Sequence, residues 1–316
     1  MNASPSPIHA GERRMHQQLG LEEFMAQRAP LMIRREMPEQ HRAFFELLPW
    51  LLIGGLDAQA QPWASLLAGP PGFAHSPSPD CLQLDAEPLV GDPLAASWQL
   101  GAPIGLLGLQ AHTKRRNRLN GRLLAAEAGR LSIGVSQSFG NCPKYIHPRE
   151  AFFAPAQEAR NAPPIKLGPA LNERARQIIR SADTFFIASA SAQAGDVAAP
   201  ASEGVDVSHR AGPPGFVRLS QDAQGACHLD VPDYPGNQLF NTLGNVLVQE
   251  RVGLLFIEFH SGSLLWLSGL AFVEMQDQAL IQQFDSAQRL LRIKLAQGLL
   301  GEQAAPLRWR EPSSCP

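Results

Sequence analysis

The segment Lys114–Asn120 places four cationic side chains within five residues, directly after an apolar run that is typical of a strand. Cations this close repel one another unless they are solvated or face an anion. Arginine guanidinium groups present planar pairs of donors that fit phosphate oxygens. Two interpretations are therefore open: a solvated basic turn, or one wall of an anion-binding site. The residues concerned are Arg115, Arg116, Arg118 and Asn120.

A second group of polar residues lies in the carboxyl-terminal half of the chain. Small polar residues and glycines at strand ends let backbone amides approach a phosphate or a ring. Three of its asparagines lie four residues apart, a spacing that would place them on one helix face. Helix capping and turn formation explain such residues equally well. The group consists of Ser208, His209, Arg210, Pro232, Asp233, Asn237, Asn241 and Asn245.

Other catalytic patterns are weak or missing. Cys142 stands beside Lys144, and a nearby cation lowers the pKa of a thiol, but no His–Asp arrangement accompanies it, so a buried inert thiol is the simpler interpretation. The sequence has no GxGxxG, Walker, HExxH or GxSxG pattern. The nine His residues do not pair at metal-ligand spacing. We therefore predict no metal site and assign no catalytic residue.

Composition narrows the class of protein. Hydrophobic residues make up 44% and charged residues 18% of the 316 residues, as in a compact globular protein. The net charge of −2 provides no field for nucleic acid or an anionic membrane. No apolar run reaches the length of a transmembrane helix, and the first residues show no signal pattern. The four Cys form no CxxC pair. A cytoplasmic protein with reduced thiols is expected.

The chain repeats itself. The phrase Gly-Pro-Pro-Gly-Phe occurs at Gly69–Phe73 and at Gly212–Phe216, and the Gly-Leu-Leu that begins at Gly105 recurs at Gly253. This period is the length of a whole small domain and exceeds that of a solenoid unit. We therefore predict two copies of one fold in tandem, an intrachain pseudo-dimer. Ligand sites in dimers often lie between the two copies.

Short apolar segments separated by Gly/Pro turns predict a mainly β fold, a barrel or sandwich with peripheral helices. Helices are expected at Gly11–Arg28, Gln40–Leu48, Ala170–Ser181 and Asn237–Val248, and Phe152–Pro169 lacks periodicity and reads as a linker. The predicted organisation is an N-terminal helix plus first barrel in residues 1–150, a linker and helix in 151–182, and a second barrel in 183–316.

Several phrases together resemble the pyridoxamine 5′-phosphate oxidase-like, FMN-binding split-barrel proteins, and among them the long members with two halves. The resemblance runs from about His9 to Trp309. The phrases that carry it are Gly204-Val-Asp-Val-Ser-His-Arg210, Gly212-Pro-Pro-Gly-Phe-Val217, Pro232-Asp-Tyr-Pro-Gly-Asn237, Phe240-Asn-Thr-Leu-Gly-Asn245, Arg251-Val-Gly-Leu-Leu-Phe256, Arg115-Arg-Asn-Arg-Leu-Asn-Gly121 and Phe139-Gly-Asn-Cys-Pro-Lys-Tyr-Ile146.

The resemblance implies tandem antiparallel split β-barrels that hold FMN in the groove between them. It implies that Ser208, His209 and Arg210 belong to the FMN-binding strand whose arginine holds the phosphate. It further implies that the backbone of Phe216 and Val217 follows the flavin ring, and that Pro232 and Asp233 meet the ribityl chain and the ring edge. Asn237 stands where simpler members keep a basic phosphate ligand, so the arginines of Lys114–Asn120 would have to compensate. The first half lacks an equivalent of Arg210, which predicts one dominant site.

The function implied is that of an FMN-dependent oxidoreductase acting on a small-molecule substrate or a redox partner. Two alternatives stay open at this point: a non-enzymatic flavin- or haem-binding carrier or sensor, and the flavin subunit of an electron-transfer system. No nucleic acid or membrane partner is expected, and the pseudo-dimer is compatible with either a monomer or a homodimer.

Overall fold

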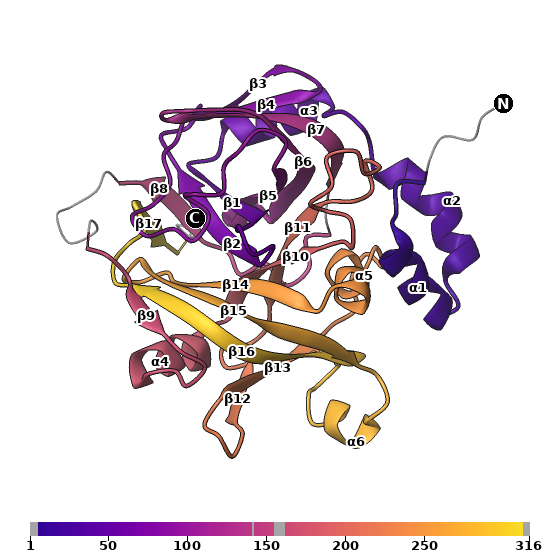
Figure 1. Ribbon diagram of the computed structural model, residues 1–316, viewed down its shortest axis with the longest axis vertical. Helices are drawn as coiled ribbons and strands as arrows, with labels where there is room; N and C mark the ends of the chain where they lie inside the picture. The colour runs from indigo at the N-terminus through magenta and orange to yellow at the C-terminus, as the bar shows by residue number, and fades with distance from the viewer. Residues whose placement is uncertain (1–5, 141, 155–161, 312–316) are drawn as a thin grey trace, which may run out of the picture.

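The computed structural model describes residues 6–140, 142–154 and 162–311, and its architecture is dominated by two antiparallel sheets that pack against each other (Figure 1). Cys315 and residues 155–161 of the predicted linker lie outside the described part. The first half contains α1 (Ala10–Gln18), α2 (Glu22–Met32), α3 (Glu39–Glu46), β1 (Trp50–Leu56), β2 (Pro62–Ala68), β3 (Ala74–Ser78), β4 (Cys81–Leu84), β5 (Pro103–Gln110), the 3-10 helix η1 (Ala111–Thr113), β6 (Arg115–Glu127) and β7 (Arg130–Gly140).

The rest of the chain begins with two short strands and continues with the second copy of the fold. Its elements are β8 (Glu150–Phe153), β9 (Ile165–Leu167), α4 (Glu173–Ser181), β10 (Thr184–Ala190), β11 (Val205–Ala211), β12 (Arg218–Gln221), β13 (Cys227–Asp233), α5 (Asn241–Val248), β14 (Arg251–Glu258), β15 (Ser263–Glu274), α6 (Gln278–Ile281), β16 (Arg289–Gly301) and β17 (Leu307–Arg310).

The two sheets have the same strand order, which confirms the repeat. The first runs β2-β1-β5-β6-β7-β4-β3, and the second runs β11-β10-β14-β15-β16-β13-β12. The registers agree as well, because Ile53 pairs with Ser65 as Ile187 pairs with Ser208. The Gly-Pro-Pro-Gly-Phe phrases form the same turn, with Gly72 at φ +96° and Gly215 at φ +81°. The predicted mainly antiparallel β fold is therefore confirmed, and it occurs twice.

The two halves meet through the strands β1, β2, β5, β10, β11 and β14. The repeated Gly-Leu-Leu explains how they approach so closely. A Cβ added at Gly105 would lie 2.4 Å from the carbonyl oxygen of Val205, and one added at Gly253 would lie 2.2 Å from that of Pro62. Each glycine thus lets a strand of the other half pass against its backbone, a contact that only a residue without a side chain permits. The same close approach between a glycine of one half and the backbone of the other half therefore occurs twice in the contact between the halves.

The hydrophobic core also joins the halves. The strands β1 and β10 are buried along almost their whole length, as their continuous apolar sequences require. Side chains such as Phe186, Leu255 and Trp266 of the second half belong to the same buried cluster as Trp50 and Leu107 of the first. Burying this apolar surface is the main force that holds the halves together.

Several local predictions were wrong. The helix predicted over Gly11–Arg28 is two helices, because the chain turns at Gly20, which has φ +67°. The predicted linker contains β9, which pairs with β16, and it begins within β8, which pairs with β17. The basic segment is not a turn, since β6 begins at Arg115.

Among the described residues, no helix is long and apolar enough to cross a membrane.

Candidate functional site

A pocket of about 130 Å³ lies where β6 of the first half meets β11, β13 and the start of α5 in the second half. We call it the seam pocket. Nine of the fourteen predicted site residues line it: Arg116, Arg118, Ser208, His209, Arg210, Pro232, Asp233, Asn237 and Asn241. Its other walls include Cys142, Lys144, Tyr145, Tyr234, Phe240 and Thr242. The tertiary structure thus brings the two polar groups of the sequence to one place.

The strand conformation sorts the arginines of β6. Successive side chains of a strand point to opposite faces, so Arg116 and Arg118 face the seam pocket together. Arg115 faces the other way, where it is exposed and its guanidinium lies 4.8 Å from the ring centroid of Phe44. This alternation explains how a run of cations that would repel one another in a turn is accommodated.

Arg118 joins the two halves by hydrogen bonds. It is 7% exposed, and its guanidinium donates to the hydroxyl of Ser208 and, at 2.9 Å, to Oδ1 of Asn241. Its Nη1 also lies 3.5 Å from a carboxylate oxygen of Asp206. Burial lowers the pKa of Arg118, while Asp206 acts in the opposite direction. The side chain is fixed, and it presents positive charge to the seam pocket from inside the protein.

Arg116 contacts His209 in a way that determines the charge of the imidazole. The Nη1 of Arg116 lies 2.9 Å from Nδ1 of His209. A guanidinium can only donate, so Nδ1 must accept and His209 must be neutral. Burial, and then the positive charge of Arg116, lower the pKa of His209 well below its usual value. Burial lowers the pKa of Arg116 to about 10, so Arg116 is charged at neutral pH.

The carboxylate of Asp233 positions Arg210 in the wall of the seam pocket that the second half provides. The Nη1 of Arg210 donates to Oδ1 of Asp233 at 2.5 Å, and the Nε of Arg289 lies 3.4 Å from the second carboxylate oxygen. Arg289 also lies over the ring of Phe240, at 5.0 Å from its centroid. One carboxylate therefore positions two arginines, and Arg210 has donors left for a ligand.

Three buried donors around the seam pocket have no partner. The Nε atoms of Arg116, Arg118 and Arg210 make no hydrogen bond within the part of the chain that the structure describes. Leaving a buried charged donor unpaired is costly. A phosphate has several acceptor oxygens and would satisfy such donors with charge-assisted hydrogen bonds. The residues present therefore fit a phosphate group, and three arginines from two halves would hold it.

A second layer of polar residues supports Arg118. Asp206 accepts from Asn120 at 2.7 Å and from Asn245 at 3.1 Å. Asn241 donates at 2.6 Å to Glu12 of α1, which brings the N-terminal helix into the support of the site. Burial raises the pKa of Glu12 well above its usual value. Asn120 and Asn245 thus act on the seam pocket through Asp206.

The remaining predicted residues lie outside the lining of the seam pocket. Phe216 and Val217 are buried in the core of the second half, where Phe216 stacks on Phe185 with ring centroids 5.9 Å apart. Asn237 does not share a helix face with Asn241 and Asn245, because α5 begins at Asn241 and both Gln238 and Phe240 have positive φ. Sequence reasoning missed Asp206, Glu12 and Thr242, although Asp206 lies inside the quoted phrase that ends at Arg210.

The position equivalent to the seam pocket in the other half of the pseudo-dimer is filled. Strand register makes Trp266 the counterpart of Arg118, and Ser65 the counterpart of Ser208. The indole Nε1 of Trp266 donates to the hydroxyl of Ser65 at 3.1 Å, as Arg118 donates to Ser208. Leu66 and Leu67 replace His209 and Arg210. This side is part of the hydrophobic core.

A buried acid in this filled side predicts a pH effect. Asp92 accepts from Ser65 at 2.5 Å, and burial raises its pKa from 3.8 to about 6. The folded state therefore holds a proton more tightly than the unfolded state, so stability falls as pH rises from about 4 to 6, by roughly 3 kcal/mol. Asp92→Asn should remove this fall. Urea unfolding of both proteins between these pH values measures it, and parallel curves would contradict the assignment.

Comparisons with known proteins give matches to solved structures alone. No protein-family model matches the chain, and no curated protein matches it. Among solved structures, the chain is similar to HutZ, the haem storage protein from Vibrio cholerae (14% identity, TM-score 0.27, covering 42% of this chain and 96% of that one). It is also similar to an FAD-binding protein from Mesorhizobium loti (14%, 0.28, 43% and 97%).

A third structure carries the name of the family noted above. It is a protein of the pyridoxinephosphate oxidase family from Clostridium acetobutylicum (6% identity, TM-score 0.26, covering 44% of this chain and 92% of that one). The resemblance to pyridoxamine 5′-phosphate oxidase-like proteins is thus found again among solved structures. Each of these three structures covers less than half of this chain.

Proposed function

We propose that the chain binds FMN with its phosphate in the seam pocket and acts as an FMN-dependent oxidoreductase on a small molecule or a redox partner. The observation that supports this most is the trio of unpartnered guanidinium Nε groups of Arg116, Arg118 and Arg210 around one pocket. The family resemblance of the phrases around them is the reason to choose a flavin among phosphate ligands. The proposal also includes a cytoplasmic location for the protein.

In this proposal the arginines bind the phosphate, and Ser208 and His209 position them. Arg116 and Arg118 of the first half and Arg210 of the second bind the phosphate, and the hydroxyl of Ser208 orients Arg118. His209 stays neutral and holds Arg116 in place. Bound FMN would supply hydride or electron transfer. The contribution of the chain is binding and orientation across the seam, which neither half provides alone.

Arg116→Ala should lower the affinity for FMN by about 10–100-fold, because a charge-assisted contact to the phosphate contributes about 1.5–3 kcal/mol. Riboflavin lacks the phosphate, so its affinity should not change. Arg115→Ala is the matched control, since Arg115 is the next residue on β6 and faces away from the seam pocket. Titration of the three proteins with both flavins measures this.

Two results would contradict the phosphate site: equal affinity of the unmodified protein for FMN and riboflavin, or equal losses in the Arg115 and Arg116 variants. Mass spectrometry of any yellow chromophore that copurifies identifies the bound flavin directly. The oxidoreductase part of the proposal is tested separately. Adding NADPH without oxygen should bleach the flavin absorbance, whereas a carrier or a subunit that needs its own reductase would keep its colour.

A further inference from the structure

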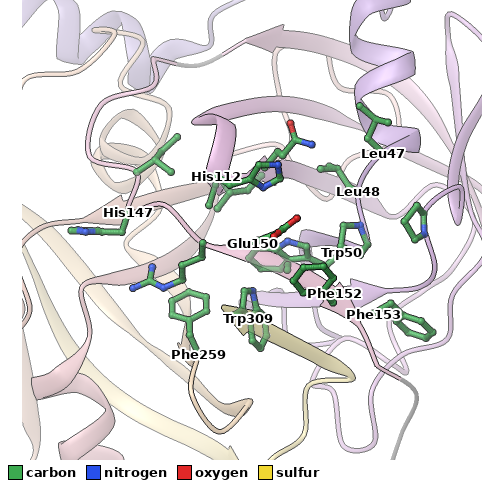
Figure 2. A pocket seen from close by; sticks show the side chains of 18 of the residues that line it. Leu47, Leu48, Trp50, His112, His147, Glu150, Phe152, Phe153, Phe259 and Trp309 are labelled. Carbon is green, nitrogen blue, oxygen red and sulfur yellow. The ribbon is translucent and has the colours of Figure 1, made fainter. Parts of the chain in front are cut away.

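A larger cavity of about 510 Å³ lies beside the seam pocket and shares His209 with it. We call it the apolar cavity. Its walls come from both halves and from the β8–β17 ribbon, and Figure 2 shows aromatic side chains on one side and His112 on the other. The residues that carry the argument are Trp50, Phe259, Trp309 and Thr184. Its size lies within the usual range for small-molecule sites, whereas the seam pocket is smaller.

The aromatic residues of the apolar cavity form a fixed cluster. The ring of Trp309 meets Trp50 at 5.8 Å and Phe259 at 5.3 Å between centroids, both edge to face. Phe152 and Leu47 stand at the cavity and are more than one-third exposed. Faces and edges of fixed rings favour a flat aromatic molecule, since aromatic pairs adopt stacked and edge-to-face arrangements.

The charged groups of the apolar cavity are already paired. Arg149 forms an ion pair with Asp183, and Glu150 pairs with Arg310 at 2.8 Å. His147 Nε2 lies 2.9 Å from the carbonyl oxygen of Gly212, so this nitrogen carries a proton and donates. Each of these charges is offset by its own partner, so the cavity favours a neutral occupant.

Two donors in the same walls are left without partners. The indole Nε1 of Trp309 and the hydroxyl of Thr184 make no hydrogen bond to any described residue. Thr184 is 3% exposed, and both residues line the apolar cavity. An indole N–H can only donate, and a threonine hydroxyl can donate as well. An occupant with acceptor atoms would satisfy these donors.

We propose that the apolar cavity binds a neutral, planar, conjugated ring compound of the quinone class, whose carbonyls accept hydrogen bonds from Trp309 and Thr184. The site is separate from the seam pocket. Its role as the place of the second reactant rests on the proposed flavin function, whereas binding itself does not. Because His209 belongs to both cavities, a molecule here lies beside the groups that would hold the flavin phosphate.

Duroquinone is a suitable probe, because its ring has no free position to which a cysteine could add. It should quench tryptophan fluorescence saturably. Trp309→Phe keeps the ring and removes the donor, and Thr184→Val keeps the shape, so each should weaken binding by about 3–10-fold, the range for one hydrogen bond. Trp98→Phe is the matched control, since the Nε1 of Trp98 also has no partner among the described residues but lies outside the cavity walls.

Durene has the same shape without carbonyls and should compete at least tenfold more weakly than duroquinone binds. Circular dichroism confirms that each variant is folded. Absent saturation, equal binding of durene, or an equal effect of Trp98→Phe would overturn the proposal. Displacement of duroquinone by FMN would also overturn it, because the cavity would then belong to the flavin ring. Duroquinone binding by a protein that ignores FMN would contradict the flavin proposal and leave this one standing.

Discussion

Replacing Arg118 with methionine is expected to lower the free energy of unfolding by about 3–5 kcal/mol, the cost of removing one partner from a buried ion pair. Methionine keeps the length and the apolar stem of the side chain. The loss would come from Asp206, whose carboxylate would stay buried with the amides of Asn120 and Asn245 but without a cation. Urea unfolding followed by circular dichroism measures the difference.

The double variant Arg118→Met/Asp206→Asn is the critical control. Removing both charges should recover much of the lost stability, since no uncompensated charge is then left. The double variant should still bind FMN more weakly than the unmodified protein, because one of the three arginines that would bind the phosphate is gone, whereas its affinity for riboflavin should not change. A loss below about 1 kcal/mol in the single variant would contradict the buried ion pair, and no recovery in the double variant would show that packing dominates.

Trp266→Ala is expected to cost about 3–5 kcal/mol, as usual for a fully buried aromatic side chain. Trp266 occupies the position that Arg118 occupies in the other half, and it is 0% exposed. Trp266→Phe should cost less, because it keeps most of the packing and loses mainly the hydrogen bond to Ser65. Urea unfolding of the two variants separates packing from hydrogen bonding.

Neither Trp266 variant should change the affinity for FMN, since the seam pocket lies on the opposite side of the pseudo-dimer. A drop in FMN affinity would show that ligand binding depends on both sides. A cost below about 1 kcal/mol for Trp266→Ala would contradict its role in the shared core. Taken together, the Arg118 and Trp266 variants test whether one copy holds a polar binding site while the equivalent position of the other copy is part of the hydrophobic core.

Much of the fold was predictable because the repeated phrases mark positions where the backbone itself imposes the residue. Gly105 and Gly253 recur because each meets a strand of the other half, and the Gly-Pro-Pro-Gly-Phe turns recur because their second glycine has positive φ. Apolar runs such as Trp50–Leu56 were recognisable as strands from their continuous apolar sequence, and the structure buries them. Local rules of this kind act within a few residues, so a single sequence displays them.

The predictions that failed were decided by distant contacts. Phe152–Pro169 showed no periodicity because β8 and β9 are short and exist through pairing with β17 and β16. The apolar cavity was missed for the same reason, since Trp50 and Trp309 lie far apart in the sequence. The basic segment was expected in a turn, because nothing local shows that half of its cations would find partners across the seam.

The sequence by itself determined the duplication, the antiparallel sheets and the identity of nine of the residues that line the seam pocket. The tertiary structure alone decided which of them face one another, because β6 turns Arg116 and Arg118 toward β11 and turns Arg115 away. It also decided what occupies the equivalent space in the other copy, where Trp266 donates a hydrogen bond to Ser65. The physical reason is that the positive charge of the seam pocket comes from arginines of both halves, and those arginines are buried only where the two halves meet. Neither half has this charge and this burial by itself.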